Sequence, residues 1–279
     1  MLLVCLIWGV NFSVTKLALD VIPALPFTAV RFTLASLLLW AIVRATETPE
    51  PLARGDLRLL VILGVVGNTL YQTAFVLGLE RTTATNSSLI LATMPTMVAV
   101  FGGILGIERV SRRMWLGIVL GTAGVVLVIA TSGIEFSTRT LRGDLLTVLA
   151  LFCWAGYTLG LRTLPEGLSP LRVTAVTNIA GTPGLLLLGL PGMLRLDWRA
   201  VPPKGWAALG YATVLSLVVA YVLWNRSVKA VGGARTAIYM CVTPLVAVAA
   251  AWLLLGEQPQ PLQGVGAVLI VAGVLLTRM

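Results

Sequence analysis

The side chains of this sequence that could bind a small molecule are aromatic, amide and hydroxyl groups inside long apolar runs. Aromatic rings bind flat or apolar groups by stacking and desolvation, while a few amides and hydroxyls orient a polar end. Several of these residues are three or four positions apart and therefore share one face of a helix. The residues predicted to line a binding cavity are Trp8, Asn11, Tyr71, Phe75, Ser88, Met94, Trp154, Tyr157, Trp224 and Tyr239.

Two further sets of residues bear on this prediction. Asn68 and Gln72 share the face next to that of Tyr71 and Phe75. Tyr221 and Asn225 stand on the same side of their run as Trp224. The alternative role for Trp and Tyr is a belt at the membrane–water interface, where such rings also gather. The aromatic residues near the ends of the runs, which we expect in that belt, are Trp40, Trp115, Trp198, Trp206 and Tyr211.

Proline and glycine punctuate the apolar runs. Pro95 and Pro244 each stand in the middle of a run, where proline removes a helical hydrogen bond and kinks the helix. We expect these kinks to act as hinges or to narrow one end of the cavity, and the alternative is a packing kink without a mechanical role. Glycines on one helical face let two backbones approach closely, which predicts packing or dimerisation at Gly117, Gly121, Gly124, Gly266 and Gly273.

Two basic residues, Lys16 and Arg31, are counted within the predicted spans, whereas the others lie in loops or at span ends. Either could attract a carboxylate. Lys16 could equally extend to the interface, and Arg31 could be held by backbone carbonyls. All eleven acidic residues lie near the ends of the predicted spans, and Glu108 and Glu257 are expected to pair with a nearby arginine or cap a helix.

The residues that are missing exclude most enzyme chemistry. The sequence has no histidine, which removes Ser-His and Cys-His catalysis and His-ligated metals. Its three cysteines, Cys5, Cys153 and Cys241, lie in apolar stretches without a CxxC pair, so neither a disulfide framework nor a zinc site is expected. No metalloprotease or phosphate-binding motif falls in a span. We therefore predict no catalytic residues, no metal and no cofactor.

The composition places most of the chain in lipid. Of the 279 residues 58% are hydrophobic and 11% charged, whereas an ordinary soluble domain carries roughly 25% charged residues. A helix needs about 20 mostly apolar residues to cross the hydrocarbon. Ten such segments are predicted, at about 2–20, 27–45, 57–79, 83–105, 113–131, 143–162, 170–190, 205–226, 234–255 and 261–278.

The distribution of basic residues predicts the orientation. With the N-terminus in the cytoplasm, the inside loops and the C-terminus carry twelve Lys and Arg residues and the outside loops carry six. Excess Lys and Arg marks the cytoplasmic side, so both termini are predicted there, although the outside loop 195–204 carries three of the six. The same bias accounts for the net charge of +9, and no nucleic-acid partner is expected.

The two halves of the sequence resemble each other. At an offset of 146 residues Leu6-Ile7-Trp8-Gly9 matches Phe152-Cys153-Trp154-Ala155, and at an offset of 149 Pro95 matches Pro244. Each copy, 1–135 and 136–279, contains five predicted helices, and an odd number turns the second copy upside down in the membrane. Inverted repeats are a recurring transporter architecture, whereas the alternative is a duplication that only built a stable bundle.

These motifs resemble the drug/metabolite transporter superfamily of the EamA type. The residues that carry the resemblance are Trp8-Gly9-Val10-Asn11-Phe12 with Lys16, Arg31-Phe32, Pro95 followed by Glu108, and Pro244 followed by Glu257. The second copy departs from the first, because Trp154-Ala155-Gly156-Tyr157 replaces the Trp-Gly-x-Asn run and Thr177 replaces Arg31. Within the superfamily the ten-helix layout is most similar to the YddG-type exporters of aromatic amino acids and methionine.

The resemblance implies an all-α integral membrane protein of ten transmembrane helices, built as two inverted five-helix repeats around a central cavity. It implies a multi-pass protein of the cell inner membrane that exports amino acids by alternating access, as a monomer or weak dimer. Because no mid-span acid or histidine is available for a proton relay, we expect uniport down the substrate gradient. The alternatives are export of another drug or metabolite, possible coupling to protons, and, less favoured, a channel, a receptor or an intramembrane enzyme.

Overall fold

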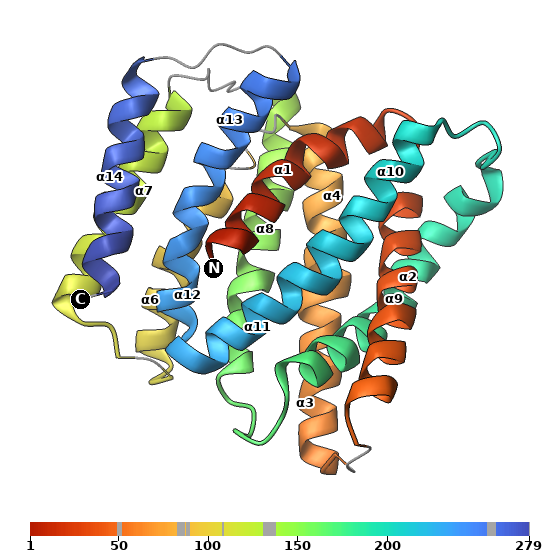
Figure 1. Ribbon diagram of the computed structural model, residues 1–279, viewed down its shortest axis with the longest axis horizontal. Coiled ribbons are helices and arrows are strands. Elements are labelled where there is room, and N and C mark those ends of the chain that lie inside the picture. The colour runs from red at the N-terminus through yellow and green to blue at the C-terminus, as the bar shows by residue number, and fades with distance from the viewer. Residues whose placement is uncertain are drawn as a thin grey trace.

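The computed structural model describes residues 1–48, 52–82, 87, 90–107, 109–130, 138–255 and 261–278. Helices account for most of these residues, and no strand occurs in these ranges (Figure 1). In chain order they are α1 Leu2–Leu19, α2 Ala24–Thr46, α3 Arg54–Gly64, η1 Val65–Leu70, α4 Tyr71–Arg81, α6 Met94–Ile104, α7 Arg112–Ala130, α8 Thr138–Leu161, α9 Pro170–Arg195, α10 Pro203–Tyr211, η2 Ala212–Val219, α11 Ala220–Val231, α12 Gly233–Ala237, η3 Ile238–Val242, α13 Thr243–Leu255 and α14 Pro261–Arg278.

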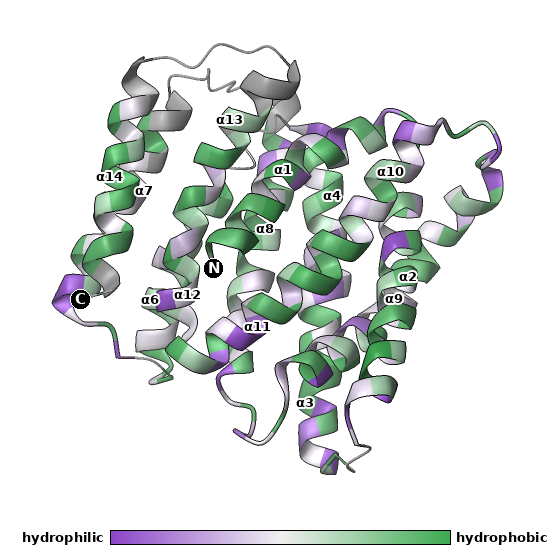
Figure 2. Cartoon of the chain, in the orientation of Figure 1, coloured by the Kyte–Doolittle hydropathy of each residue, from purple (hydrophilic) through white to green (hydrophobic). Residues whose placement is uncertain are grey.

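Several helical stretches are long and apolar enough to cross a membrane. Within the described residues there are six, namely Leu2–Leu19, Ala24–Thr46, Arg54–Arg81, Leu141–Leu161, Pro170–Arg195 and Pro203–Val231. Met94–Ile104 and Gly264–Leu276 are apolar but shorter. Figure 2 shows hydrophobic residues along the helices and hydrophilic ones mainly near their ends, and many large apolar side chains face outward. An apolar outer surface of this kind belongs to a multi-pass membrane protein.

Two of the long stretches contain a π-helical segment that the sequence pattern did not predict. The segment Val65–Leu70 joins α3 to α4, and Ala212–Val219 joins α10 to α11. A π-helical turn holds an extra residue, so the residues after it are rotated relative to an ideal α-helix, and such segments are frequent at functional sites. Both segments lie directly before residues that line the cavity described below.

The helices α7 and α14 pack through glycines. A Cβ atom on Gly124 would lie 2.6 Å from the carbonyl oxygen of Gly266, and one on Gly273 would lie 2.5 Å from that of Gly117. Only glycine permits backbones to approach this closely. The partners follow one another in opposite order along the two helices, which are therefore antiparallel (Figure 1). These glycines thus pack within the chain, as the packing interpretation of the sequence requires.

The helices α2 and α9 form a second antiparallel pair. The hydroxyls of Ser36 and Thr182 lie 2.8 Å apart and share a hydrogen bond in the buried interface. Nearer the start of α2, a Cβ atom on Gly189 would lie 2.6 Å from the Cβ of Ala29. Later residues of α9 therefore meet earlier residues of α2, and the second half of the chain packs along the first.

The positions of the prolines differ from the prediction of mid-helix kinks. Pro95 lies in the first turn of α6, after a turn at Thr93, and Pro244 lies in the first turn of α13, after the 3₁₀ segment η3. In a first turn the missing N–H of proline has no helical partner to lose. The α-helix is therefore interrupted before each proline and not kinked at it. The prolines that do lie inside a helix, Pro183 and Pro191 of α9, were not predicted to matter.

The hydrophobic core has two parts. The larger cluster fills the middle of the bundle and includes Leu60, Met94, Ile118 and Trp224. The smaller one, around Ile22, packs the end of α1 against α2 and α10. The aromatic residues predicted to line the cavity belong to the larger cluster or pack against it.

Candidate functional site: a cavity between aromatic rings and a buried arginine

A cavity of about 50 Å³ lies inside the larger cluster, between residues of both halves of the chain. Six of the ten predicted binding residues line it, which are Trp8, Asn11, Tyr71, Phe75, Met94 and Trp154. The remaining lining residues are Phe12, Arg31, Gln72, Leu91, Ser216, Tyr221 and Met240. The structure therefore brings six of the predicted residues together at one cavity, while about half of its wall consists of residues that had not been selected.

Trp154 of α8 is the centre of the aromatic wall. Its ring centroid lies 4.8 Å from that of Tyr71, 5.2 Å from that of Tyr221 and 5.7 Å from that of Trp8. These distances and the mostly tilted or edge-on arrangements are those of favourable aromatic pairs. Trp8 is held in turn by a hydrogen bond of 3.1 Å from its Nε1 to the carbonyl oxygen of Ser216.

Tyr157 and Trp224 lie behind Trp154 and do not line the cavity in this conformation. Their centroids are 5.1 and 5.6 Å from that of Trp154. The Tyr157 hydroxyl donates a hydrogen bond of 3.1 Å to Oδ1 of Asn225. A Cβ atom on Gly67 would lie 2.3 Å from the Tyr157 ring, so the π-helical segment η1 can approach this tyrosine only because it carries a glycine there. These two residues support Trp154 from behind.

The two other predicted binding residues are not part of the described wall. Tyr239 is partly buried next to the lining residue Met240, and its carbonyl oxygen accepts a hydrogen bond of 3.0 Å from the Cys5 thiol. Ser88 lies outside the described residues.

One end of the cavity is polar. Arg31 is 1% exposed, and its Nη2 donates a hydrogen bond of 2.6 Å to Oε1 of Gln72. Nε2 of Gln72 donates in turn to the Tyr221 hydroxyl at 2.9 Å. The guanidinium carbon also lies 5.1 Å from the ring centroid of Phe27 and 5.8 Å from that of Phe32, within the range of cation–π contacts. Arg31 is therefore held by an amide side chain and two rings, and the suggested backbone carbonyls are not its recorded partners.

The other basic residue of the spans has a different place. Lys16 is exposed near the end of α1 and does not line the cavity. Of the two candidates for attracting a carboxylate, only Arg31 faces the site.

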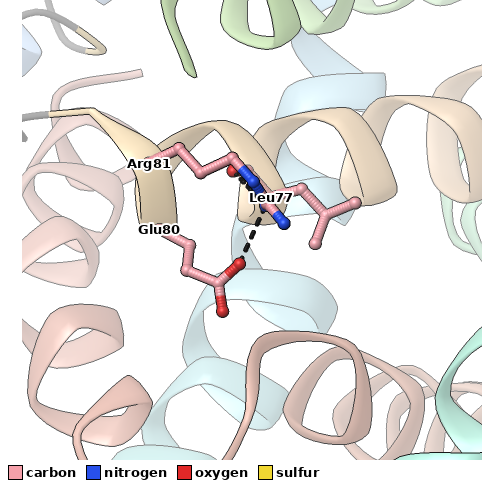
Figure 3. Close-up of polar contacts among 3 residues, drawn as sticks. All are labelled: Leu77, Glu80 and Arg81. Atoms are coloured by element: carbon pink, nitrogen blue, oxygen red, sulfur yellow. Dashed lines mark hydrogen bonds and ion pairs between the residues drawn. The ribbon is translucent and has the colours of Figure 1, made fainter. Parts of the chain in front are cut away.

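None of the described lining residues is acidic. The ion pair recorded among the described residues joins Arg81 to Glu80 at the end of α4, with 2.8 Å between Nη1 and Oε2 (Figure 3). The same Arg81 nitrogen donates to the carbonyl oxygen of Leu77 at 2.8 Å, and both charged side chains are exposed. Exposed pairs of this kind contribute little to stability. The charge that bears on the cavity is the buried one of Arg31.

The lining residues that were not selected had partial signals in the sequence. Gln72 follows Tyr71 directly, and Tyr221 precedes Trp224 by three residues, so both stood beside selected residues. The π-helical segments η1 and η2 change the rotation of the residues that follow them, and this affects which side chains face the cavity. The hydrophobic pattern of the sequence does not show this rotation.

The sequence matches the EamA-like transporter family over residues 1–130 and 141–279, which is nearly the whole chain. The chain belongs to the EamA-like transporter family. The resemblance to the EamA-type drug/metabolite transporters is therefore confirmed. The chain is a transporter of the membrane and not an enzyme, as the chemistry missing from the sequence indicated.

Relatives along the full chain are also transporters. An uncharacterized transporter of Archaeoglobus fulgidus is 32% identical, over 99% of this EamA-like chain and 94% of its own length. The uncharacterized transporter YyaM of Bacillus subtilis is 28% identical, over 96% and 88%. A protein of Streptantibioticus cattleyicolor named "Probable terminal-alkyne amino-acid exporter" is 26% identical, over 96% and 89%. A solved crystal structure shares the fold, with a TM-score of 0.80 and 18% identity, over 99% of this chain and 93% of that one.

Proposed function

We propose that this EamA-like transporter exports amino acids with aromatic or other apolar side chains, such as methionine, out of the cytoplasm. The observation that carries the proposal is a cavity with aromatic and methionine side chains on most of its wall and a buried arginine at one end. Rings and thioethers suit an apolar side chain, and the arginine suits a carboxylate. The relative named as an amino-acid exporter supports the same substrate class.

The size of the cavity supports transport by alternating access. A volume of about 50 Å³ leaves room for about one or two water molecules, whereas sites for small molecules usually measure about 300–1,000 Å³. An amino acid therefore binds only when the helices around the cavity move apart. We infer that this conformation is a nearly closed one, between states that open to either side of the membrane.

Contacts between equivalent residues of the two copies support an internal two-fold axis. Trp8 contacts Trp154, and Ser36 contacts Thr182, each at the repeat offset of 146 residues. Gln72 is hydrogen-bonded to Tyr221 at the offset of 149. Residues that contact their own equivalents lie near a two-fold axis. This axis would pass through the cavity wall, where both copies could exchange conformations around one substrate.

The α7–α14 interface supports the inverted sense of the repeat. Gly117 and Gly124 correspond to Gly266 and Gly273 at the offset of 149, and the contacts are reciprocal, from Gly124 to Gly266 and from Gly273 to Gly117. Reciprocal contacts are typical of a two-fold interface. Because these equivalent helices are antiparallel, as are α2 and α9, we propose that 1–135 and 136–279 form two inverted five-helix repeats with ten membrane spans. Their glycines are used inside the chain, which favours a monomer or weak dimer.

Cysteine labelling tests the inversion and the proposed cytoplasmic termini. Thr48 follows α2 and Ala200 follows α9, the equivalent helix, and Figure 1 places these two helix ends at opposite ends of the molecule. In a background with the three buried cysteines replaced by alanine, Ala200→Cys should react with a membrane-impermeant maleimide in intact cells. Thr48→Cys should react only after permeabilisation. Labelling of both from the same side would contradict the inverted repeat.

Counterflow in proteoliposomes tests the substrate class. Vesicles loaded with unlabelled phenylalanine or methionine should accumulate the labelled amino acid, and vesicles loaded with glutamate or lysine should not. An imposed proton gradient should leave the steady rate unchanged, because the sequence has no histidine and none of the described lining residues is acidic. Exchange of no amino acid would overturn the proposal. A sharp rise with the gradient would favour the proton-coupled alternative.

A further inference from the structure

We propose that the polar residues of the cavity wall bind the charged backbone groups of a free amino acid, with Arg31 on the carboxylate and Asn11 on the ammonium. Under this inference, which rests on the proposed function, the transporter selects for the zwitterion as well as for the apolar side chain. Gln72 and Tyr221 act as positioning residues for Arg31.

Among the residues that the structure describes, the charge of Arg31 has no acidic counterpart in the cavity wall. The side chain is 1% exposed, its guanidinium stays protonated in proteins, and no described residue of the wall is an aspartate or glutamate. A buried charge without a partner of opposite sign costs free energy. A bound carboxylate would remove that cost, because guanidinium and carboxylate pair well in geometry and charge.

The hydrogen bonds around Arg31 leave donors available. Its Nη2 donates to Gln72, whereas its Nε has no partner among the described residues. The amide of Gln72 is oriented by two bonds, since its oxygen accepts from Arg31 and its nitrogen donates to the Tyr221 hydroxyl. The Tyr221 oxygen thus accepts from Gln72, and its own hydrogen remains to be donated. A group that only accepts hydrogen bonds, such as a carboxylate, fits these donors.

Asn11 supplies a hydrogen-bond acceptor, whereas the groups around Arg31 supply donors. It lines the same cavity, is 7% exposed, and its Oδ1 has no hydrogen-bond partner within the described part of the chain. A buried acceptor without a partner is costly and is satisfied by a donor that arrives with the ligand. An ammonium group carries three such donors.

The number of charges favours an amino acid over other anions. A phosphate-linked substrate carries about two negative charges and is usually held by several basic residues, whereas Arg31 is the basic residue of the described wall. One cation and one neutral acceptor match the single carboxylate and single ammonium of a zwitterion. The rings and methionines of the same wall would then take the side chain.

The competing explanation is that Arg31 only packs on Phe27 and Phe32 of its own helix and links α2 to Gln72 of α4. The two explanations differ in what they predict for ligands that lack one charged group. A structural arginine changes the yield and thermal stability of the protein but not its preference among phenylalanine analogues.

The test is competition in counterflow with labelled phenylalanine. For the wild-type protein, phenylalaninamide and phenethylamine, which lack the carboxylate, should compete at least about tenfold more weakly than phenylalanine. Phenylpropionate, which lacks the ammonium, should also compete more weakly. In Arg31→Gln the preference for phenylalanine over the amide should disappear, while Arg31→Lys should keep part of it. In Asn11→Leu the preference over phenylpropionate should fall.

Controls separate the possible failures. Arg81→Gln removes an exposed arginine and should change no preference. If Arg31→Gln does not fold, the wild-type competition alone decides, because equal competition by phenylalanine and its amide overturns the inference while the proposed function stands. A folded Arg31→Gln protein that still prefers the acid also overturns it. The absence of any amino-acid exchange would overturn both proposals.

Discussion

Replacing Trp154 with leucine should raise the KM for phenylalanine at least tenfold while the protein still folds. Trp154 contacts the rings of Trp8, Tyr71 and Tyr221 in the cavity wall. Aromatic pairs contribute about 0.5–1.5 kcal/mol each beyond the area they bury. A substrate ring that loses such a contact binds about tenfold more weakly for each 1.4 kcal/mol. Leucine fills more of the space than alanine does, which limits the loss of stability.

The measurement is counterflow in proteoliposomes, normalised to protein that elutes as a single species in size-exclusion chromatography. Phe152→Leu is the matched control, since Phe152 lies two residues earlier on α8 and is exposed on the outer surface. It should leave the KM unchanged. A folded Trp154→Leu protein with the wild-type KM for phenylalanine would mean that the aromatic wall does not bind the substrate.

Gly273→Ala should be the most destabilising of the conservative substitutions in the α7–α14 interface. A Cβ atom at this position would lie 2.5 Å from the carbonyl oxygen of Gly117 and 2.6 Å from the backbone nitrogen of Gly121. Backbone atoms cannot rotate away as side chains do, so the two helices must separate. Overpacking of this kind costs about 1–3 kcal/mol, more than the roughly 1 kcal/mol that alanine gains over glycine in a helix.

Thermal unfolding in detergent, followed by tryptophan fluorescence, measures the effect. The control is Gly264→Ala on the same helix, where no atom lies within 4 Å of an added Cβ. That variant should unfold at the wild-type temperature or slightly above it. If the two variants unfold at the same temperature, the close contact between α7 and α14 is absent in the folded protein.

Contacts between the two proposed repeats form part of the cavity wall as well as the interfaces elsewhere in the bundle. The contacts Trp8–Trp154 and Gln72–Tyr221 lie in the cavity wall, while α2–α9 and α7–α14 join equivalent helices elsewhere in the bundle. A motion of one copy relative to the other therefore changes the cavity wall directly. This coupling is what the proposed alternating access would require of the proposed inverted repeat.

The amino-acid sequence by itself determined the class of the protein and pointed to part of the wall of its central cavity. Six of the predicted ranges correspond to helical stretches long and apolar enough to span a membrane, because lipid forces backbone groups to bond within a helix. The missing histidine argued against His-dependent catalysis, and the position of the acids near the span ends argued against a proton relay within the membrane. The spacing of Trp8, Tyr71, Phe75 and Trp154 pointed to the aromatic wall, because residues three or four apart share a helix face.

Only the tertiary structure decided which neighbours of these residues face the cavity. The π-helical segments rotate Gln72 and Tyr221 relative to the regular helical pattern, and no sequence period records that rotation. Pro95 and Pro244 lie in the first turns of α6 and α13, because the α-helix is interrupted before each of them, at Thr93 and at η3. Where the helix is interrupted depends on how the surrounding residues pack. Arg31 could be assigned to the cavity only when Gln72, 41 residues away in the chain, was found to hold it there. Contacts between distant segments arise from the packing of whole helices, and local periodicity does not contain that information.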